Sequence, residues 1–158
     1  MRGRVALDAG AAAGGFTKVL LEAGARRVYA VEAGHELLGS LRQDPRVVNL
    51  EGTNLGELDR RLVPDPVEVV TLDLSYLPLA DAVPQLDRVQ IAPGADLGAL
   101  VPQFELGLAE SPADGPILRA ALERALAGIG AANWRVVASI RSPVRGACGA
   151  IIHARRET

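Results

Sequence analysis

The chain has 158 residues, a formal net charge of −2 and one cysteine, a length at which a single domain can bury a substantial core. Apolar residues make up 49% of the chain but aromatic residues only 3%, so the core must be built from alanine, valine and leucine. No apolar run is long enough to cross a bilayer and no secretory leader opens the chain, which excludes a membrane-spanning class.

The first predicted elements are a strand, a small-residue turn and a helix. Residues 4–8 form an apolar run that ends at Asp8, Gly10 and Gly14 lie in the turn, and a helical pattern covers residues 15–23. This order is typical of an open α/β sheet, which binds ligands at the carboxyl ends of its strands. Glycines let the backbone turn sharply and let a ligand lie against it. The spacing differs from the dinucleotide pattern G-x-G-x-x-G, and a turn that only packs remains the alternative.

Two further strands are expected, each followed by polar residues. Residues 27–32 predict a strand that closes on Glu32, at about the spacing from the first strand at which a carboxylate accepts hydrogen bonds from ribose hydroxyls. A solvated carboxylate at the end of a strand is the alternative interpretation. A helix is expected over residues 35–41 and a short strand over 47–50, after which Asn54 lies in a polar loop at the same sheet edge.

The clearest buried strand covers residues 67–73 and ends in Asp73. The carboxyl end of a central strand is where doubly wound folds carry out their reactions. A helical stretch is expected before it, over residues 55–62, and another after it, over 79–89, where Pro84 should kink or split the helix.

The remaining elements complete an α/β pattern. They are a turn at residues 93–94, strands over 96–101, 134–140 and 149–154, a long loop over 102–116 and a helix over 116–129. Strands alternating with helices predict a seven-stranded, mainly parallel sheet with helices on both faces, formed by a single domain over residues 1–158. A closing antiparallel strand pair is the arrangement of Rossmann-like S-adenosylmethionine (SAM) methyltransferases.

Short segments along the chain match one family pattern. They are residues 7–17 (LDAGAAAGGFT), 28–34 (VYAVEAG), 41–47 (LRQDPRV), 53–54 (TN), 73–76 (DLSY), 102–105 (PQFE) and 142–143 (SP). Together they resemble the FtsJ-like ribosomal-RNA 2′-O-methyltransferases, and within that family the haemolysin-A-like (TlyA-type) branch. The resemblance covers nearly the whole chain and implies SAM as the cofactor.

The resemblance also implies roles for individual residues. Asp8, Gly10 and Gly14 would shape the SAM pocket, Phe16 would follow them in the same cofactor-binding segment, Glu32 would hold the ribose, Asn54 would lie beside the adenine, and Asp73 would lie beside the methionine end and the transferred methyl group. Asp73 is also the implied catalytic residue.

The chain departs from the family at the lysine-aspartate-lysine-glutamate set that handles the proton of the ribose hydroxyl, because only Asp73 matches. Val101 occupies the place of the second lysine, and Ile152 falls at about the place of the glutamate. The first lysine belongs to a segment ahead of the first strand, as does the small RNA-binding domain usual in this branch. Lys18 is the only lysine, and it lies on a helix in a different register.

Three functions therefore stay open. The chain methylates a ribose hydroxyl of ribosomal RNA, acts with SAM on a small molecule, or binds SAM without turnover. A net charge of −2 does not point to nucleic acid. If the chain acts on a small molecule, we expect a closed acceptor pocket bounded by Tyr76 and Phe104. In the alternative interpretation, these two side chains only pack under the loops.

The other reactive or charged residues can be interpreted as purely structural. His35 fits a helix cap better than a catalytic role, and Cys148 fits a buried filler. Arginines 141, 145, 155 and 156 form either an anion site or a solvated edge. A single cysteine precludes an internal disulfide and fits a reducing cytoplasm. Two histidines with one cysteine give no metal-ligand spacing, so no metal is expected.

Overall fold

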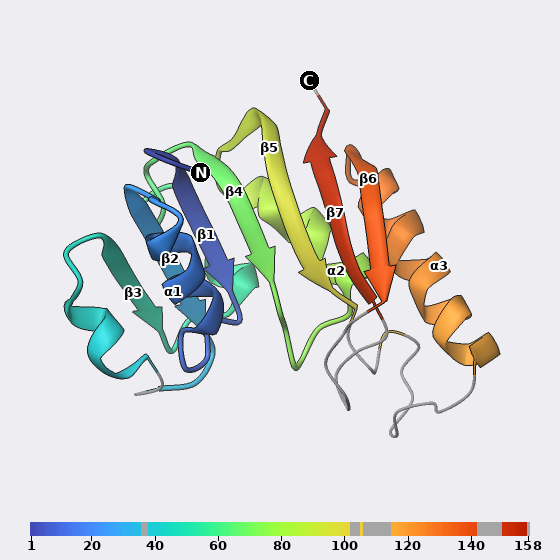
Figure 1. Ribbon diagram of the computed structural model, residues 1–158, viewed down its shortest axis with the longest axis horizontal. Coiled ribbons are helices and arrows are strands. Elements are labelled where there is room, and N and C mark those ends of the chain that lie inside the picture. The colour runs from blue at the N-terminus through green and yellow to red at the C-terminus, as the bar shows by residue number, and fades with distance from the viewer. Residues whose placement is uncertain (36–37, 102–104, 106–114, 142–149, 158) are drawn as a thin grey trace.

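The computed structural model joins seven strands into one sheet and describes residues 1–35, 38–101, 105, 115–141 and 150–157. The strands are β1 (Val5–Ala9), β2 (Arg27–Glu32), β3 (Val47–Glu51), β4 (Val67–Leu72), β5 (Ile91–Leu100), β6 (Trp134–Arg141) and β7 (Ala150–Arg156). Their order is β3-β2-β1-β4-β5-β7-β6, and β7 runs antiparallel to both of its neighbours (Figure 1). The predicted seven-stranded, mainly parallel α/β sheet is confirmed.

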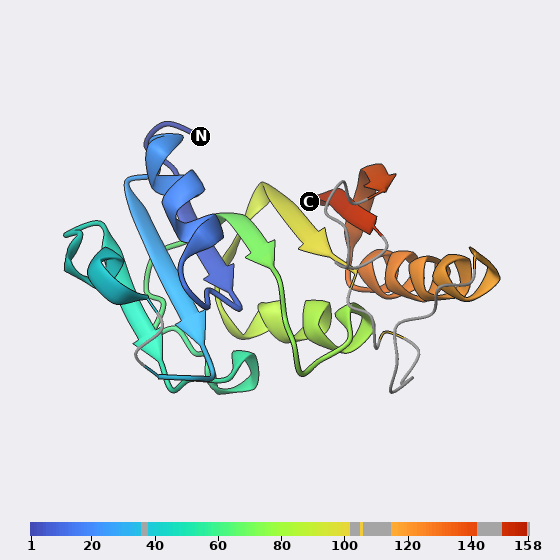
Figure 2. The same cartoon turned by 60° about the horizontal axis from the view of Figure 1, so that its bottom comes forward.

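Helices cover both faces of the sheet, as predicted. They are α1 (Gly15–Glu22), η1 (Gly39–Gln43), η2 (Leu55–Glu57), α2 (Leu79–Ala82), η3 (Val83–Arg88) and α3 (Gly115–Ala131). Successive strand residues point to opposite faces, so Ala6 packs with Leu20 and Leu21 of α1, whereas Leu7 belongs to a larger cluster with Ile129 of α3. Figure 2 shows α1 on one side of the sheet and α2, η3 and α3 on the other.

Two predicted helices are shorter than expected. Of the helix expected over residues 35–41, residues 36–37 lie outside the described part, and the helical residues that the structure describes there are the 3₁₀ helix η1 from Gly39 to Gln43. The stretch expected over 55–62 is helical only over Leu55–Glu57. The carboxylate of Asp59 then accepts the backbone N–H groups of Arg61 and Leu62, so a side-chain-supported turn replaces the helix.

Two prolines account for the irregular helix and strand in the middle of the chain. Pro84 lies in the first turn of η3, where α2 gives way to 3₁₀ geometry, so the predicted split is confirmed. Pro93 lies inside β5, which begins at Ile91 instead of Asp96. The register between β4 and β5 shifts there, and Gly94 has a φ of +71°. Because a bulge tolerates proline and glycine, the expected turn is an irregularity within a longer strand.

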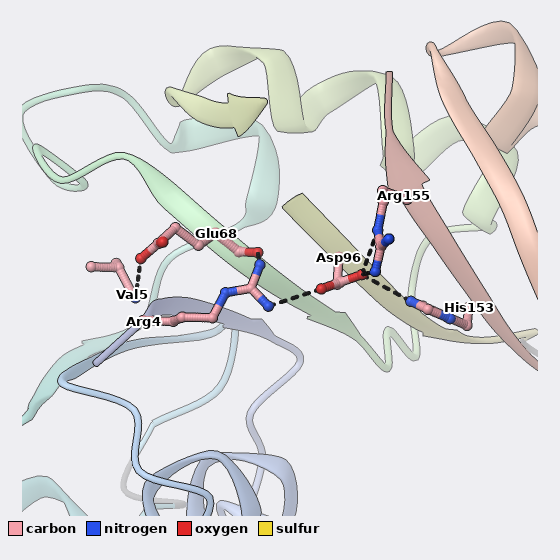
Figure 3. Close-up of polar contacts among 6 residues, drawn as sticks. All are labelled: Arg4, Val5, Glu68, Asp96, His153 and Arg155. Carbon is pink, nitrogen blue, oxygen red and sulfur yellow. Dashed lines mark hydrogen bonds and ion pairs between the residues drawn. The ribbon is translucent and has the colours of Figure 1, made fainter. Parts of the chain in front are cut away.

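A polar cluster lies on the sheet face opposite α3, where no helix among the described residues covers β5, β7 and β6 (Figure 1). Asp96 accepts hydrogen bonds from Arg4 at 2.8 Å and from Arg155 at 3.0 Å, and it contacts His153 at 3.0 Å (Figure 3). Partial burial opposes ionisation of this carboxyl, but these partners together hold its pKa well below the ordinary value. The cluster ties the residue just before β1 to β5 and β7 across β4. No helix of the described residues is both long and apolar enough to traverse a bilayer.

Candidate cofactor and methyl-transfer site

The turn after β1 requires glycine because protein atoms occupy the space beside it. Gly10 has a φ of +85°, and a Cβ at this position would collide with the backbone carbonyl of Asp73. Gly14 also has a φ of +85°, and a Cβ there would collide with the side chain of Leu41. The two glycines therefore let β1 and α1 approach their neighbours. The open backbone of this turn is instead at Gly15, where a Cβ would meet no atom within 4 Å.

Asp8 is fully buried and joins three elements. Its carboxylate accepts hydrogen bonds from the Thr17 hydroxyl at 2.6 Å and from the Thr71 hydroxyl at 2.7 Å. Burial raises the pKa of Asp8, and the two threonine hydrogen bonds oppose that rise. The side chain thus clamps α1 and β4 against β1.

Glu32 fastens the glycine-rich turn to the end of β2. One carboxylate oxygen accepts the backbone N–H of Ala12 at 2.9 Å, and the other accepts the backbone N–H of Gly34 at 2.8 Å. Each oxygen keeps acceptor capacity after one such bond, and the side chain is only partly buried. The carboxylate can therefore accept a further hydrogen bond from a donor outside the protein.

Asn54 is exposed and takes part in a local cap. Its backbone N–H donates to the Glu57 carboxylate at 2.7 Å, its side-chain amide donates to the same oxygen at 3.1 Å, and the two residues form a capping box at η2. The next backbone N–H, of Leu55, donates to the Tyr76 hydroxyl at 3.1 Å. This bond ties the exit of β3 to the segment after β4.

Asp73 follows β4 at the same edge. Its backbone N–H donates to the carbonyl of Ala9 at 3.0 Å, so the residue is fixed directly beside the turn after β1. Its side chain is exposed. None of the described residues donates a hydrogen bond to its carboxylate or forms an ion pair with it. Partial desolvation raises its pKa above the ordinary value. A carboxylate with these properties is available to a substrate.

The positions at which the family has further charged residues are apolar or remote. Val101 and Ile152 are both buried and belong to the same hydrophobic cluster. Lys18 is exposed on α1 and lies 3.9 Å from Glu22, so its ammonium group faces solvent. Phe16 is partly buried in the first turn of α1.

One residue with a structural role escaped the sequence reasoning. Glu105 is fully buried, and its carboxylate accepts the backbone N–H groups of Leu79 and Ala80. The PQFE segment was its only signal.

Tyr76 is 44% exposed, whereas Phe104, Arg145 and Cys148 lie outside the described residues. Within the described part of the chain, no group of three or more histidine, cysteine, aspartate or glutamate side chains could hold a metal ion.

Comparison with known proteins decides the family. Residues 1–151 match the pattern described as FtsJ-like methyltransferase. This chain belongs to the FtsJ-like methyltransferase family. It is similar to the 16S/23S rRNA (cytidine-2′-O)-methyltransferase TlyA of Mycobacterium tuberculosis: the two are 41% identical over 157 residues, which is 93% of this chain and 57% of TlyA. The FtsJ-like chain thus spans little more than half the length of that relative.

Solved structures agree with the family. A protein from Streptococcus thermophilus that is assigned to the hemolysins superposes with a TM-score of 0.89 at 26% identity, over 99% of this FtsJ-like chain and 60% of that protein. An S-adenosylmethionine-dependent methyltransferase from Mesorhizobium loti shares the fold, with a TM-score of 0.72 at 15% identity over 98% and 92% of the two chains.

Proposed function

We propose that residues 1–158 form a single methyltransferase domain that binds SAM at the exits of β1, β2 and β3 and transfers a methyl group to a ribose 2′-hydroxyl of ribosomal RNA. The observation that carries the proposal is Asp73, an exposed carboxylate without a described partner, fixed beside the turn after β1. Family membership supplies the reaction class, and the TlyA relative supplies the RNA acceptor. A ribosomal RNA acceptor would also locate the protein in the cytoplasm.

The residues at this edge fit a nucleoside-bearing cofactor. Glu32 would accept hydrogen bonds from the ribose hydroxyls, because its two oxygens are oriented by Ala12 and Gly34 and are still accessible. Asn54 would lie beside the adenine, on the capped turn of η2. Asp8, Gly10 and Gly14 would act indirectly, by holding the turn in place, and Phe16 would flank it.

Asp73 would handle the acceptor hydroxyl. SAM, when bound, would supply an electrophilic methyl group. As the acceptor oxygen bonds to that carbon, the carbon–sulfur bond would break with its electron pair going to sulfur, the demethylated thioether would leave, and the hydroxyl would lose its proton. A carboxylate within hydrogen-bond reach orients the hydroxyl and accepts this proton. A raised pKa makes Asp73 a better proton acceptor than an ordinary aspartate, and alignment of donor and acceptor lowers the remaining barrier.

A small-molecule acceptor is the second candidate, and Val101 and Ile152 favour it. Both positions are apolar and buried in one cluster, so the acceptor side of the edge lacks the charges that the family resemblance places there. An acceptor more acidic than a ribose hydroxyl would need less help in losing its proton. Binding of SAM without turnover would follow if Asp73 alone were insufficient.

Two measurements test the proposal in order. Calorimetry with SAM and with its demethylated product tests the cofactor site before any acceptor is chosen. Incorporation of labelled methyl groups into bacterial ribosomal subunits and into free ribosomal RNA then tests the acceptor, with Asp73→Ala as the comparison. Incorporation that is lost in Asp73→Ala supports RNA methylation. Folded, SAM-loaded protein that labels no RNA rejects it and leaves the small-molecule and non-catalytic alternatives.

A further inference from the structure

Glu105 is a buried carboxylate that none of the roles above uses. It is 0% exposed. One oxygen accepts the Leu79 N–H at 2.7 Å, and the other accepts the Ala80 N–H at 3.1 Å. No cation among the described residues pairs with it. Because a buried charge is costly without hydrogen bonds, these two backbone groups account for its position.

The same bonds complete the start of a helix. The first four N–H groups of a helix have no partner within it. The N–H groups of Asp81 and Ala82 donate to the carbonyl of Pro78 at 3.1 and 2.9 Å, and Pro78 makes no side-chain cap. Leu79 and Ala80 are left, and Glu105 satisfies both. The cap of α2 thus comes from a residue beyond β5 instead of from the preceding residue, which is the usual source.

Besides the burial of Leu74 in the core, three hydrogen-bonded attachments among the described residues hold the segment that carries Asp73, and this cap is one of them. At its start, the Asp73 N–H donates to Ala9. In its middle, the Tyr76 hydroxyl accepts the Leu55 N–H. At its end, Glu105 holds the first turn of α2. The first two attachments come from strand exits on the cofactor side, and Glu105 is the attachment from the β5 side.

We propose that Glu105 is a positioning residue for Asp73, which fixes the segment 73–78 by capping α2 from across the sheet edge. The inference rests on the proposed function only in naming Asp73 as the group that meets the acceptor. The carboxylate acts through the backbone and touches neither cofactor nor acceptor. Its loss should therefore affect turnover and the backbone at Asp73, and it should leave the cofactor side unchanged.

The test compares Glu105→Ala and Glu105→Gln with Leu86→Ala. Leu86 is buried in η3, so its truncation destabilises the same helical segment and leaves the carboxylate cap intact. The alanine variant should lower kcat for methyl transfer to ribosomal subunits by about ten- to a hundredfold, the scale expected for a displaced catalytic group. The affinity for SAM should stay within about twofold. The glutamine variant keeps one acceptor oxygen and should recover part of kcat.

Hydrogen exchange at the Asp73 amide gives a second readout that needs no acceptor. The alanine variant should lose protection at Asp73 as well as at Leu79 and Ala80, and Leu86→Ala, compared at equal global stability, should not. If Glu105→Ala loses protection only at Leu79 and Ala80 and keeps kcat, Glu105 is a structural cap and the proposal is wrong. If the wild-type protein methylates no acceptor, the proposed RNA methylation fails separately, and the exchange at Asp73 still decides the role of Glu105.

Discussion

The carboxyl edge of the sheet has two halves that hold their charged groups differently. In the half proposed to bind the cofactor (the cofactor half), at the exits of β1, β2 and β3, Asp8 and Glu32 each accept two hydrogen bonds from the protein. In the acceptor half, at the exits of β4 and β5 and the start of β7, the Asp73 carboxylate accepts none from the described residues, and Val101 and Ile152 are apolar and buried. The half proposed to bind the cofactor is preorganised by the fold, whereas in the half proposed to bind the acceptor Asp73 is the carboxylate that the described residues leave open to a substrate.

The difference has a physical consequence. Groups whose hydrogen bonds are already satisfied stay in place when a ligand binds, so the cofactor half should bind with little rearrangement. A carboxylate that lacks partners gains its hydrogen bonds from the substrate. Substitutions in the two halves should therefore separate binding of the cofactor from turnover.

The largest effect is expected for Asp73→Asn. The amide keeps the shape of the side chain but is a poor proton acceptor, so turnover should fall by about 10² to 10⁴, the usual contribution of general acid–base catalysis. The dissociation constant for SAM, measured by calorimetry, should change little. An equal loss of cofactor binding and turnover would place Asp73 in the cofactor half and remove the distinction between the two.

Glu32→Gln tests the cofactor half. The amide retains one acceptor oxygen, but its NH₂ group meets a backbone N–H of Ala12 or Gly34, so one donor is left unsatisfied at a cost of about 1–3 kcal/mol. That cost falls on the turn itself. SAM affinity should also fall, by roughly tenfold, because a ribose hydroxyl donates about 1 kcal/mol more strongly to a charged carboxylate than to a neutral amide, and about 1.4 kcal/mol corresponds to a factor of ten. Glu123→Gln, at an exposed position of α3 on the far side of the sheet, is the matched control. Unchanged affinity in Glu32→Gln would mean that the carboxylate serves the turn alone.

Much of this edge was predictable from the sequence, for reasons that particular residues show. Asp8, Glu32 and Asp73 follow apolar runs that could only be buried parallel strands, and parallel strands bring their carboxyl ends to one edge. The partners of these residues were not predictable. Gly10 was expected to face a ligand, and it faces the carbonyl of Asp73, a contact between residues far apart in the sequence. Asn54 read as a ligand contact, and its amide is engaged in a local cap.

Local periodicity also misjudged two elements, for two different reasons. Asp59 converts an expected helix into a turn by accepting N–H groups within three residues. Pro93 reads as a chain break, but the bulge in β5 accommodates it. The role proposed for Glu105 could not be predicted, because its partners Leu79 and Ala80 lie on a different element, far from it in the sequence.

A smaller effect, on the pH dependence of stability, is expected for Asp8→Asn. The pKa of Asp8 is raised in the folded protein, so the folded state binds its proton more tightly than the unfolded chain does. The contribution of this group to the free energy of unfolding is greatest below its ordinary pKa of 3.8, and it declines as the pH rises through the folded pKa. Urea unfolding between about pH 3 and 8 should show a flatter decline in Asp8→Asn.

Asp96→Asn is the control of opposite sign. The pKa of Asp96 is lowered by its arginine and histidine partners, so its stabilisation is present above the ordinary value of 3.8 and is lost as the pH falls below that value. Removing it should weaken the acid sensitivity of the protein and leave the decline above about pH 4 in place. If both variants changed the profile in the same direction, the assignment of these shifts to the two carboxyls would be wrong.

The smallest effect is expected for Lys18→Ala. Lys18 is the only lysine of the chain, so it is the one candidate for a catalytic lysine, and membership of the FtsJ-like family makes that role worth excluding. Its side chain is 67% exposed and lies 3.9 Å from Glu22, and an exposed helical pair of this kind is worth about 0.3–0.5 kcal/mol. Turnover and SAM affinity should match the wild type, and the free energy of unfolding should fall by no more than that amount. A loss of turnover comparable to that of Asp73→Asn would show that α1 reaches the reacting atoms, and the acceptor half would then need a second charged group from the cofactor half.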